Sequence, residues 1–79
     1  MTLYVCNYAV PFPRSEYGGI VGIVAESDED AEKIYLKWID PYDIEDYPEI
    51  PSKITDAVKK AERFNNVGGK ARVAFNFIT

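Results

Sequence analysis

The sequence predicts an α+β domain in the order β-β-α-α-β, with a three-stranded antiparallel sheet and two helices on one of its faces. Three observations support this prediction: two strand-like segments at the N-terminus, two segments with helical spacing of apolar residues, and an alternating segment at the C-terminus. With 79 residues, the chain has room for one hydrophobic core and therefore for one domain, residues 1–79.

The first two strands are expected to form a hairpin. Residues 2–10 are rich in β-branched and aromatic side chains, which favour a strand, and Pro11 and Pro13 end it because proline cannot donate to a ladder. Residues 20–25 form the second apolar run. Since the connection is short, the two strands should pair in antiparallel fashion.

The first helix has the clearest local signals in the chain. Ser27 is a good N-cap, and Asp30 follows it by three residues, as in a capping box with aspartate. Apolar residues then recur at helical spacing and predict a buried stripe: Ala31, Ile34, Tyr35, Trp38 and Ile39. The pair Asp40-Pro41 ends the helix because a residue before proline disfavours the helical conformation.

The second half of the chain is expected to contain a loop, a helix and a strand. Residues 40–51 have neither helical nor strand periodicity, and three prolines among many acids predict a long loop, which is often functional. Ser52 is expected to cap a helix over 52–65. A third strand follows, expected to pair with the second, with these residues on its inner side: Ala71, Val73, Phe75 and Phe77.

Charge is distributed unevenly along the sequence. From Glu26 to Glu49, ten acidic residues stand against two lysines, whereas the C-terminal third is basic. The net charge of −4 argues against a protein that binds nucleic acid through its phosphates. The alternative, nucleic-acid binding, would use the basic residues of the C-terminal third: Lys59, Lys60, Arg63, Lys70 and Arg72.

The side-chain inventory argues against an enzyme, a metal site or a cofactor. The chain has no histidine and a single cysteine, Cys6, which removes the usual base of a nucleophilic mechanism and zinc sites built from cysteine and histidine. Cys6 is expected to be a core residue. The acids from Asp40 to Glu49 are hard ligands for calcium, but their spacing is not that of an EF-hand loop. Gly18, Gly19 and Gly22 enter a strand and do not form a phosphate loop.

A cytoplasmic protein that does not span a membrane is expected. The N-terminus lacks a basic region followed by an apolar run, and no apolar segment approaches the ~20 residues of a membrane span. Cys6 has no second cysteine with which to form an intramolecular disulfide.

The acidic segment is the main candidate for binding a protein partner. Carboxylates that alternate with tyrosine provide anchors within a negative rim, which suits a partner with a basic groove. The predicted partner-binding residues are Asp40, Tyr42, Asp43, Glu45, Asp46, Tyr47 and Glu49, together with Glu29 and Glu32.

The order of these segments resembles that of a small anti-CRISPR family, the broad-spectrum inhibitors that bind the HNH nuclease domain of Cas9. The resemblance covers residues 17–79 and includes the glycine-rich strand from Tyr17, the Ser27-capped acidic helix and the segment Pro41-Tyr42-Asp43. It implies a phage or mobile-element protein that blocks a CRISPR effector in the bacterial cytoplasm. Where those inhibitors contact the nuclease, this chain has Gly18 and about Val73, so a type I surveillance complex is an equally open target.

A different class of function is also compatible with the sequence. The chain could be a non-enzymatic regulatory or structural domain that acts as a homodimer. Its first strand, residues 2–10, has the long apolar character that favours pairing at a sheet edge.

Overall fold

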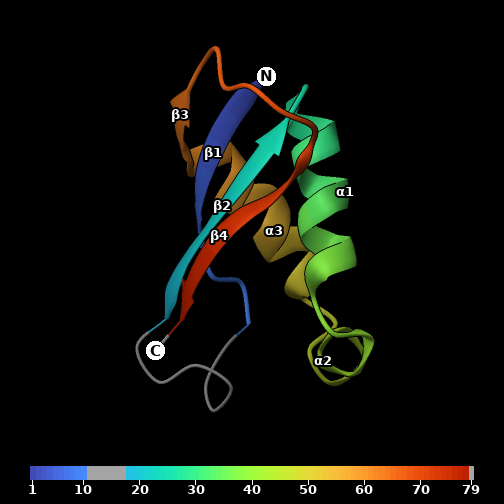
Figure 1. Cartoon of the computed structure of the whole chain (residues 1–79). Helices are drawn as coiled ribbons and strands as arrows, with labels where there is room; N and C mark the ends of the chain where they lie inside the picture. Colours follow the sequence, from blue (N-terminus) through green and yellow to red (C-terminus); the bar gives the residue numbers. More distant parts are fainter. Residues whose placement is uncertain (11–17, 79) are drawn as a thin grey trace.

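One antiparallel sheet in the spatial order β3-β1-β2-β4 forms the framework of the molecule, and α1 and α3 cover one of its faces (Figure 1). The computed structural model describes residues 1–10 and 18–78, so the predicted stop at Pro11 and Pro13 lies outside the described residues. The elements are β1 (Thr2–Asn7), β2 (Gly19–Ala25), α1 (Asp28–Trp38), α2 (Pro41–Asp46), α3 (Ile50–Lys60), β3 (Glu62–Phe64) and β4 (Arg72–Ile78). The α+β class is therefore confirmed, with four strands and three helices in place of three and two.

The N-terminal hairpin forms as predicted, although its first strand is shorter. β1 pairs with β2 in antiparallel fashion from Thr2 opposite Ala25 to Asn7 opposite Ile20. The strand ends at Asn7 because the Tyr35 hydroxyl of α1 donates to the Asn7 carbonyl at 2.6 Å and accepts from the Ala9 N–H at 2.9 Å. The Tyr8 N–H still donates to the Gly19 carbonyl of β2 at 2.9 Å, and regular pairing stops after it because Ala9 is bonded to the helix.

The predicted cap of α1 is also present. The Ser27 hydroxyl accepts a hydrogen bond from the Asp30 N–H at 3.2 Å, and the Asp30 carboxylate accepts one from the Glu26 N–H at 3.2 Å. The first bond satisfies a backbone donor of the first turn, as in a capping box. The second differs from a capping box because the Asp30 carboxylate bonds the residue before the N-cap rather than Ser27 itself.

The C-terminal part of the predicted helix 52–65 is a strand instead. α3 ends at Lys60, Ala61 takes an extended conformation, and residues 62–64 form β3 on the free side of β1. β1 is therefore an interior strand, and the expectation that it offers a free edge for dimerisation is wrong. Local helical spacing missed β3 because the strand depends on pairing with a segment sixty residues away in the sequence, from Leu3 to Val5.

The predicted loop over 40–51 is also wrong, because this segment forms α2 and the start of α3. The Asp40 carboxylate accepts from the Tyr42 N–H at 2.9 Å and so caps α2, while Pro41 occupies the first turn, where its missing N–H costs nothing. α3 begins at Ile50, two residues before the predicted cap. Ser52 is therefore inside the first turn, where its hydroxyl donates to the Glu49 carbonyl at 2.9 Å.

The core lies between the sheet and the two long helices. Inward-facing residues of β1 and β2 meet the buried sides of α1 and α3, and this core consists of Tyr4, Cys6, Ala9, Val10, Val21, Ile23, Ala25, Ala31, Tyr35, Ile39, Ile50, Ile54, Ala57 and Val58. Cys6 is a core residue, as predicted. Trp38 is only partly buried and packs edge-on against Tyr8 and Tyr35, with ring centroids 6.2 Å apart in each pair.

Arg63 attaches β3 to the rest of the fold. Its guanidinium pairs with the Asp28 carboxylate at 2.5 and 3.1 Å, donates to the Val58 carbonyl at 3.1 Å and lies 4.9 Å from the centre of the Tyr4 ring. One side chain of β3 thus contacts α1, α3 and β1. The hydrogen bonds from Arg63 and from the Tyr4 hydroxyl lower the pKa of Asp28.

We expect this ion pair to make stability depend on pH. The pKa of Asp28 is lower in the folded state than in the unfolded state. The contribution of its ionised carboxylate to the free energy of unfolding is therefore present above the ordinary carboxyl pKa of about 4, and it is lost as the pH falls through the pKa of the folded state. Asp28→Asn should therefore reduce the free energy of unfolding at pH 7, and this reduction should shrink as the pH falls through the folded-state pKa of Asp28. Urea unfolding of both proteins over this range of pH measures this, and an equal loss at every pH would contradict the ion pair.

Candidate protein-binding surface

The structure divides the nine predicted binding residues into two groups. Seven of them lie on or beside α2, whereas Glu29 and Glu32 lie on α1, whose first turn is at the opposite end of the molecule from α2 (Figure 1). The Glu32 carboxylate accepts a hydrogen bond from the Thr55 hydroxyl at 2.5 Å, which joins α1 to α3. Glu32 thus links two helices of the fold, and Glu29 lies among the acids of α1, away from those of α2.

α2 is held in place by its inner side. Ile44 and Tyr47 pack against the core, and the Tyr47 N–H donates to the Asp43 carbonyl at 2.9 Å. Asp43 is only 7% exposed and therefore offers little surface to a partner, contrary to its expected place in an exposed loop. It occupies the first turn of α2, where a negative charge suits the helix dipole.

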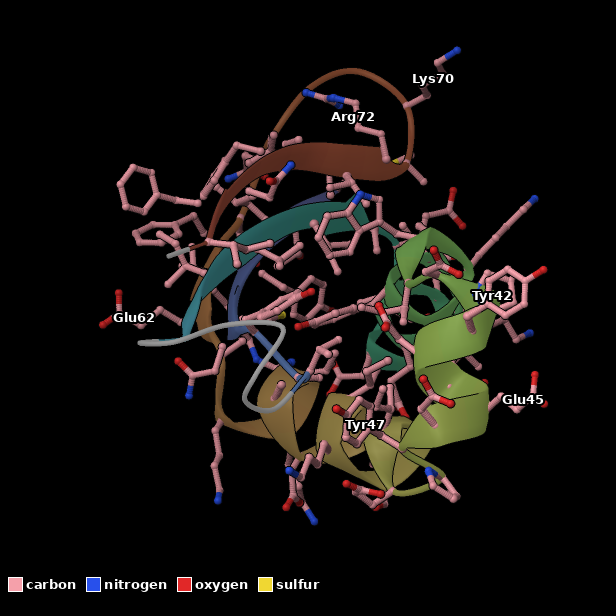
Figure 2. The ribbon with its side chains drawn as sticks, turned by 90° about the horizontal axis from the view of Figure 1, so that it is seen from below. Tyr42, Glu45, Tyr47, Glu62, Lys70 and Arg72 are labelled. Atoms are coloured by element: carbon pink, nitrogen blue, oxygen red, sulfur yellow. The ribbon has the colours of Figure 1, made fainter. Side chains whose placement is uncertain are left out.

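Exposed acidic residues lie on the outward side of α2 and just before and after it. We name this region the α2 surface, and its members are Asp40, Tyr42, Glu45, Asp46 and Glu49, all of them exposed. Tyr42 is 72% exposed, the most of any large apolar or aromatic side chain in the described part of the chain. Figure 2 shows Tyr42 and Glu45 pointing away from the molecule, whereas Tyr47 points from the other side of the helix. An exposed aromatic ring among four carboxylates is suited to a basic protein surface.

The described residues form neither a reactive cysteine site nor a cluster of metal ligands. Burial raises the pKa of the Cys6 thiol to about 11, so the thiol stays protonated at neutral pH and is a poor nucleophile. Residues 1–10 and 18–78 contain no group of three or more carboxylates and cysteines arranged to hold a metal ion. Two shallow hollows of about 200 and 350 Å³ lie where α3 passes the end of β1, and neither includes a member of the α2 surface.

Two of the five basic residues proposed for nucleic-acid binding are occupied within the fold. Arg63 pairs with Asp28, as described above. Arg72 donates to the carbonyls of Gly68 and Lys70, at 3.3 and 2.8 Å. A phosphate would therefore compete with existing partners at both arginines, which weakens that alternative.

Sequence reasoning missed a second exposed surface, on the side of the sheet away from the helices. We name it the outer face, and its members are Leu3, Val5, Asn7, Ile20, Gly22, Val24, Glu62, Phe64, Arg72, Phe75 and Phe77. Gly22 and Val24 are buried on this face, and Leu3 and Val5 are partly buried. Phe75 and Phe77 were expected on the inner side with Val73. An irregularity in the pairing leaves Ala74 without a partner in β2 and reverses the alternation, so that Val73 lies opposite Ile23 but Phe75 lies opposite Gly22.

A glycine opposite an aromatic residue is the signal that could have revealed this surface. A Cβ atom at Gly22 would lie 2.2 Å from the Phe75 ring, so the ring occupies space that only glycine leaves open. In the sequence, Gly22 interrupts an otherwise apolar strand, which is typical of a close approach by a neighbouring residue.

Comparisons with known proteins identify no relative. No protein-family profile matches the chain, and neither the curated proteins nor the solved structures include a significant match. None of the helices in the described part of the chain has the length and apolar character needed to cross a membrane.

Proposed function

We propose that this chain is a small acidic, non-catalytic inhibitor that binds a CRISPR effector through the α2 surface. The observation that carries the proposal is Tyr42, which stands 72% exposed among Asp40, Glu45, Asp46 and Glu49 on a helix fixed by its inner side. The assignment to CRISPR effectors rests on the resemblance to anti-CRISPR proteins described above. Both Cas9 and a type I surveillance complex remain candidate targets.

The chemistry of the α2 surface defines the kind of partner. Its four carboxylates have no basic residue among them, so a complementary surface is rich in lysine and arginine. Such surfaces occur where effectors hold nucleic acid or position a nuclease domain. Opposite charges accelerate encounter, and a central tyrosine anchor that becomes buried on binding supplies affinity. Inhibition then follows because the protein covers a surface that nucleic acid or the nuclease domain needs.

The test is a binding assay with purified Cas9 orthologues and type I complexes, with target-DNA binding and cleavage measured in parallel. We expect a stoichiometric complex that weakens as salt rises. The double variant Glu45→Lys/Asp46→Lys should bind at least about tenfold more weakly, because it turns attraction into repulsion at positions where lysine suits the helix end. Tyr42→Ala should also weaken binding while leaving the salt dependence in place.

A matched control separates the α2 surface from net charge. The double variant Glu26→Lys/Asp56→Lys makes the same change in charge at exposed positions outside this surface and should bind like the unaltered protein. The proposal fails if no effector forms a complex, or if the α2 variants and the control bind equally well. Loss of cleavage with DNA binding intact would assign the target to a nuclease domain, and loss of DNA binding would assign it to the nucleic-acid surface.

A second candidate function is a regulatory or structural domain that acts as a homodimer. The uncovered aromatic side chains of the outer face favour it, since contiguous apolar patches on small proteins mark interaction sites. Self-association is compatible with the inhibitor proposal as well, because the two surfaces lie on different parts of the fold.

A further inference from the structure

We infer that the outer face binds a second copy of this chain and forms a face-to-face dimer related by a two-fold axis. This inference does not depend on the proposed inhibitor function. It rests on the composition of the outer face, on the distribution of its charges and on the shape of the β4 edge.

Four apolar side chains of the outer face stay partly or largely exposed in the described part of the chain. Phe77 is 68% exposed, Phe64 is 50% exposed, and Phe75 and Ile20 are each 40% exposed. These side chains come from three different strands, so they form a surface rather than a row along one edge. Burial of such a surface against a partner is favourable in proportion to the apolar area removed from water.

Only two members of the outer face are charged, and they have opposite signs. Backbone pairing defines two neighbouring rows from β4 to β3: Arg72, Val24, Leu3 and Phe64 in one, and Phe75, Gly22, Val5 and Glu62 in the next. Arg72 is therefore at the β4 edge and Glu62 at the β3 edge, as Figure 2 shows in a view from below. Neither residue forms an ion pair with the described part of its own chain. The Arg72 guanidinium donates to the Gly68 and Lys70 carbonyls, so an ion pair with a second copy would replace or extend these hydrogen bonds.

If a two-fold axis parallel to the strands relates the two copies, the positive edge of each sheet lies over the negative edge of the other. The rotation places the β4 edge of one copy over the β3 edge of the other, so that Arg72 faces the neighbouring copy's Phe64 and Glu62. Adjacent rows are about 7 Å apart and packed sheets about 10 Å apart, which is within reach of an arginine and a glutamate that extend toward each other. The same contact occurs twice, as a closed two-fold interface requires.

This pattern favours a second copy over a strongly charged partner. A basic effector surface would gain from Glu62 but would be repelled by Arg72, whereas a copy of the same face satisfies both. The helices lie on the other side of the sheet, so the dimer would leave both α2 surfaces exposed (Figure 1). One homodimer would then present two acidic binding surfaces.

Pairing of two β4 edges is the less favourable mode. The unpaired Ala74 makes a bulge in β4, and bulges twist an edge strand away from regular pairing. An edge-to-edge dimer would also leave Phe64 uncovered, since β3 lies at the opposite edge of the sheet.

Sedimentation equilibrium of the isolated protein tests the inference without any effector. We expect dimers to appear between about 1 μM and about 1 mM, the range of weak specific association. Phe77→Asp should weaken the dimer at least about tenfold, because it places a charge in an apolar contact. Tyr42→Asp, the same kind of change at an exposed ring outside the outer face, should leave it unchanged, and circular dichroism confirms that both variants fold.

Charge exchange tests the geometry of the dimer. Glu62→Arg should weaken association by about tenfold through like-charge repulsion, and the double variant Glu62→Arg/Arg72→Glu should restore it. A monomer at all concentrations would overturn the inference. So would a dimer that tolerates Phe77→Asp, or one that the exchange of charges does not restore. Since no effector is present, each outcome is independent of the proposed inhibitor function.

Discussion

Replacement of Ile54 by alanine is expected to lower the free energy of unfolding by about 2–5 kcal/mol, the largest effect of any single substitution considered for this chain. Ile54 is on the inner side of α3 and is 1% exposed within the core. Alanine would leave a cavity that the sheet and α1 cannot easily fill. A domain of this size has a total stability of only about 4–12 kcal/mol, so the variant should be close to unfolding.

Phe77→Ala is the matched control for this core substitution. It removes a larger side chain, but Phe77 is 68% exposed on the outer face, so its loss should cost less than about 1 kcal/mol in dilute protein. Urea unfolding at low concentration, where a weak dimer dissociates, provides the comparison. Equal losses for the two variants would show that the outer face belongs to the core of the monomer.

The parts of the fold with strong local signals could be predicted from the sequence. Ser27 and Asp30 identified the start of α1, and the apolar spacing of its stripe identified its buried side. The antiparallel hairpin also followed from strand-forming residues and a short connection, and the pairing of the last strand with β2 was expected because fully antiparallel pairing needs no special crossover. For α1 and the hairpin, the information lies within a few residues of the element that it determines.

The errors arose where distant residues decide the structure. β3 has three residues, pairs with the distant β1 and is joined to α1 by the contact between Arg63 and Asp28, and no local pattern reports either interaction. The bulge at Ala74 reversed the faces of β4, so two phenylalanines expected in the core form the outer face instead. α2 is a different case, since Asp40 and Pro41 are good helix-start residues whose signal was masked by the many acids and prolines.

For the candidate site, the sequence indicated the segment of the chain but not which of its side chains face outward. The acidic segment was correctly placed in one region of the chain, and the structure keeps Asp40, Tyr42 and Glu45 exposed. Which residues of a short helix face inward depends on its docking against the core, and this docking buries Asp43. The binding role of the α2 surface stays a prediction.

Tyr35→Phe is the second substitution with a large expected effect. It removes only one oxygen, but that oxygen is buried and makes two hydrogen bonds to the backbone. The Tyr35 hydroxyl is buried, which raises its pKa, and it bonds with both the Asn7 carbonyl and the Ala9 N–H. Phenylalanine would leave these two backbone groups without their partner beside the core. The expected loss is about 1–3 kcal/mol, the cost of a buried polar group left unsatisfied.

Amide hydrogen exchange identifies the origin of that loss. In the unaltered protein the Ala9 amide should exchange slowly, and in Tyr35→Phe it should exchange much faster, because its acceptor is gone. Tyr42→Phe removes a hydroxyl from a 72% exposed ring and should change neither the stability nor the exchange of Ala9. If Tyr35→Phe is as stable as the unaltered protein and the Ala9 amide stays protected, another group accepts this hydrogen bond. In that case the early end of β1 at Asn7 has a cause other than the Tyr35 hydroxyl.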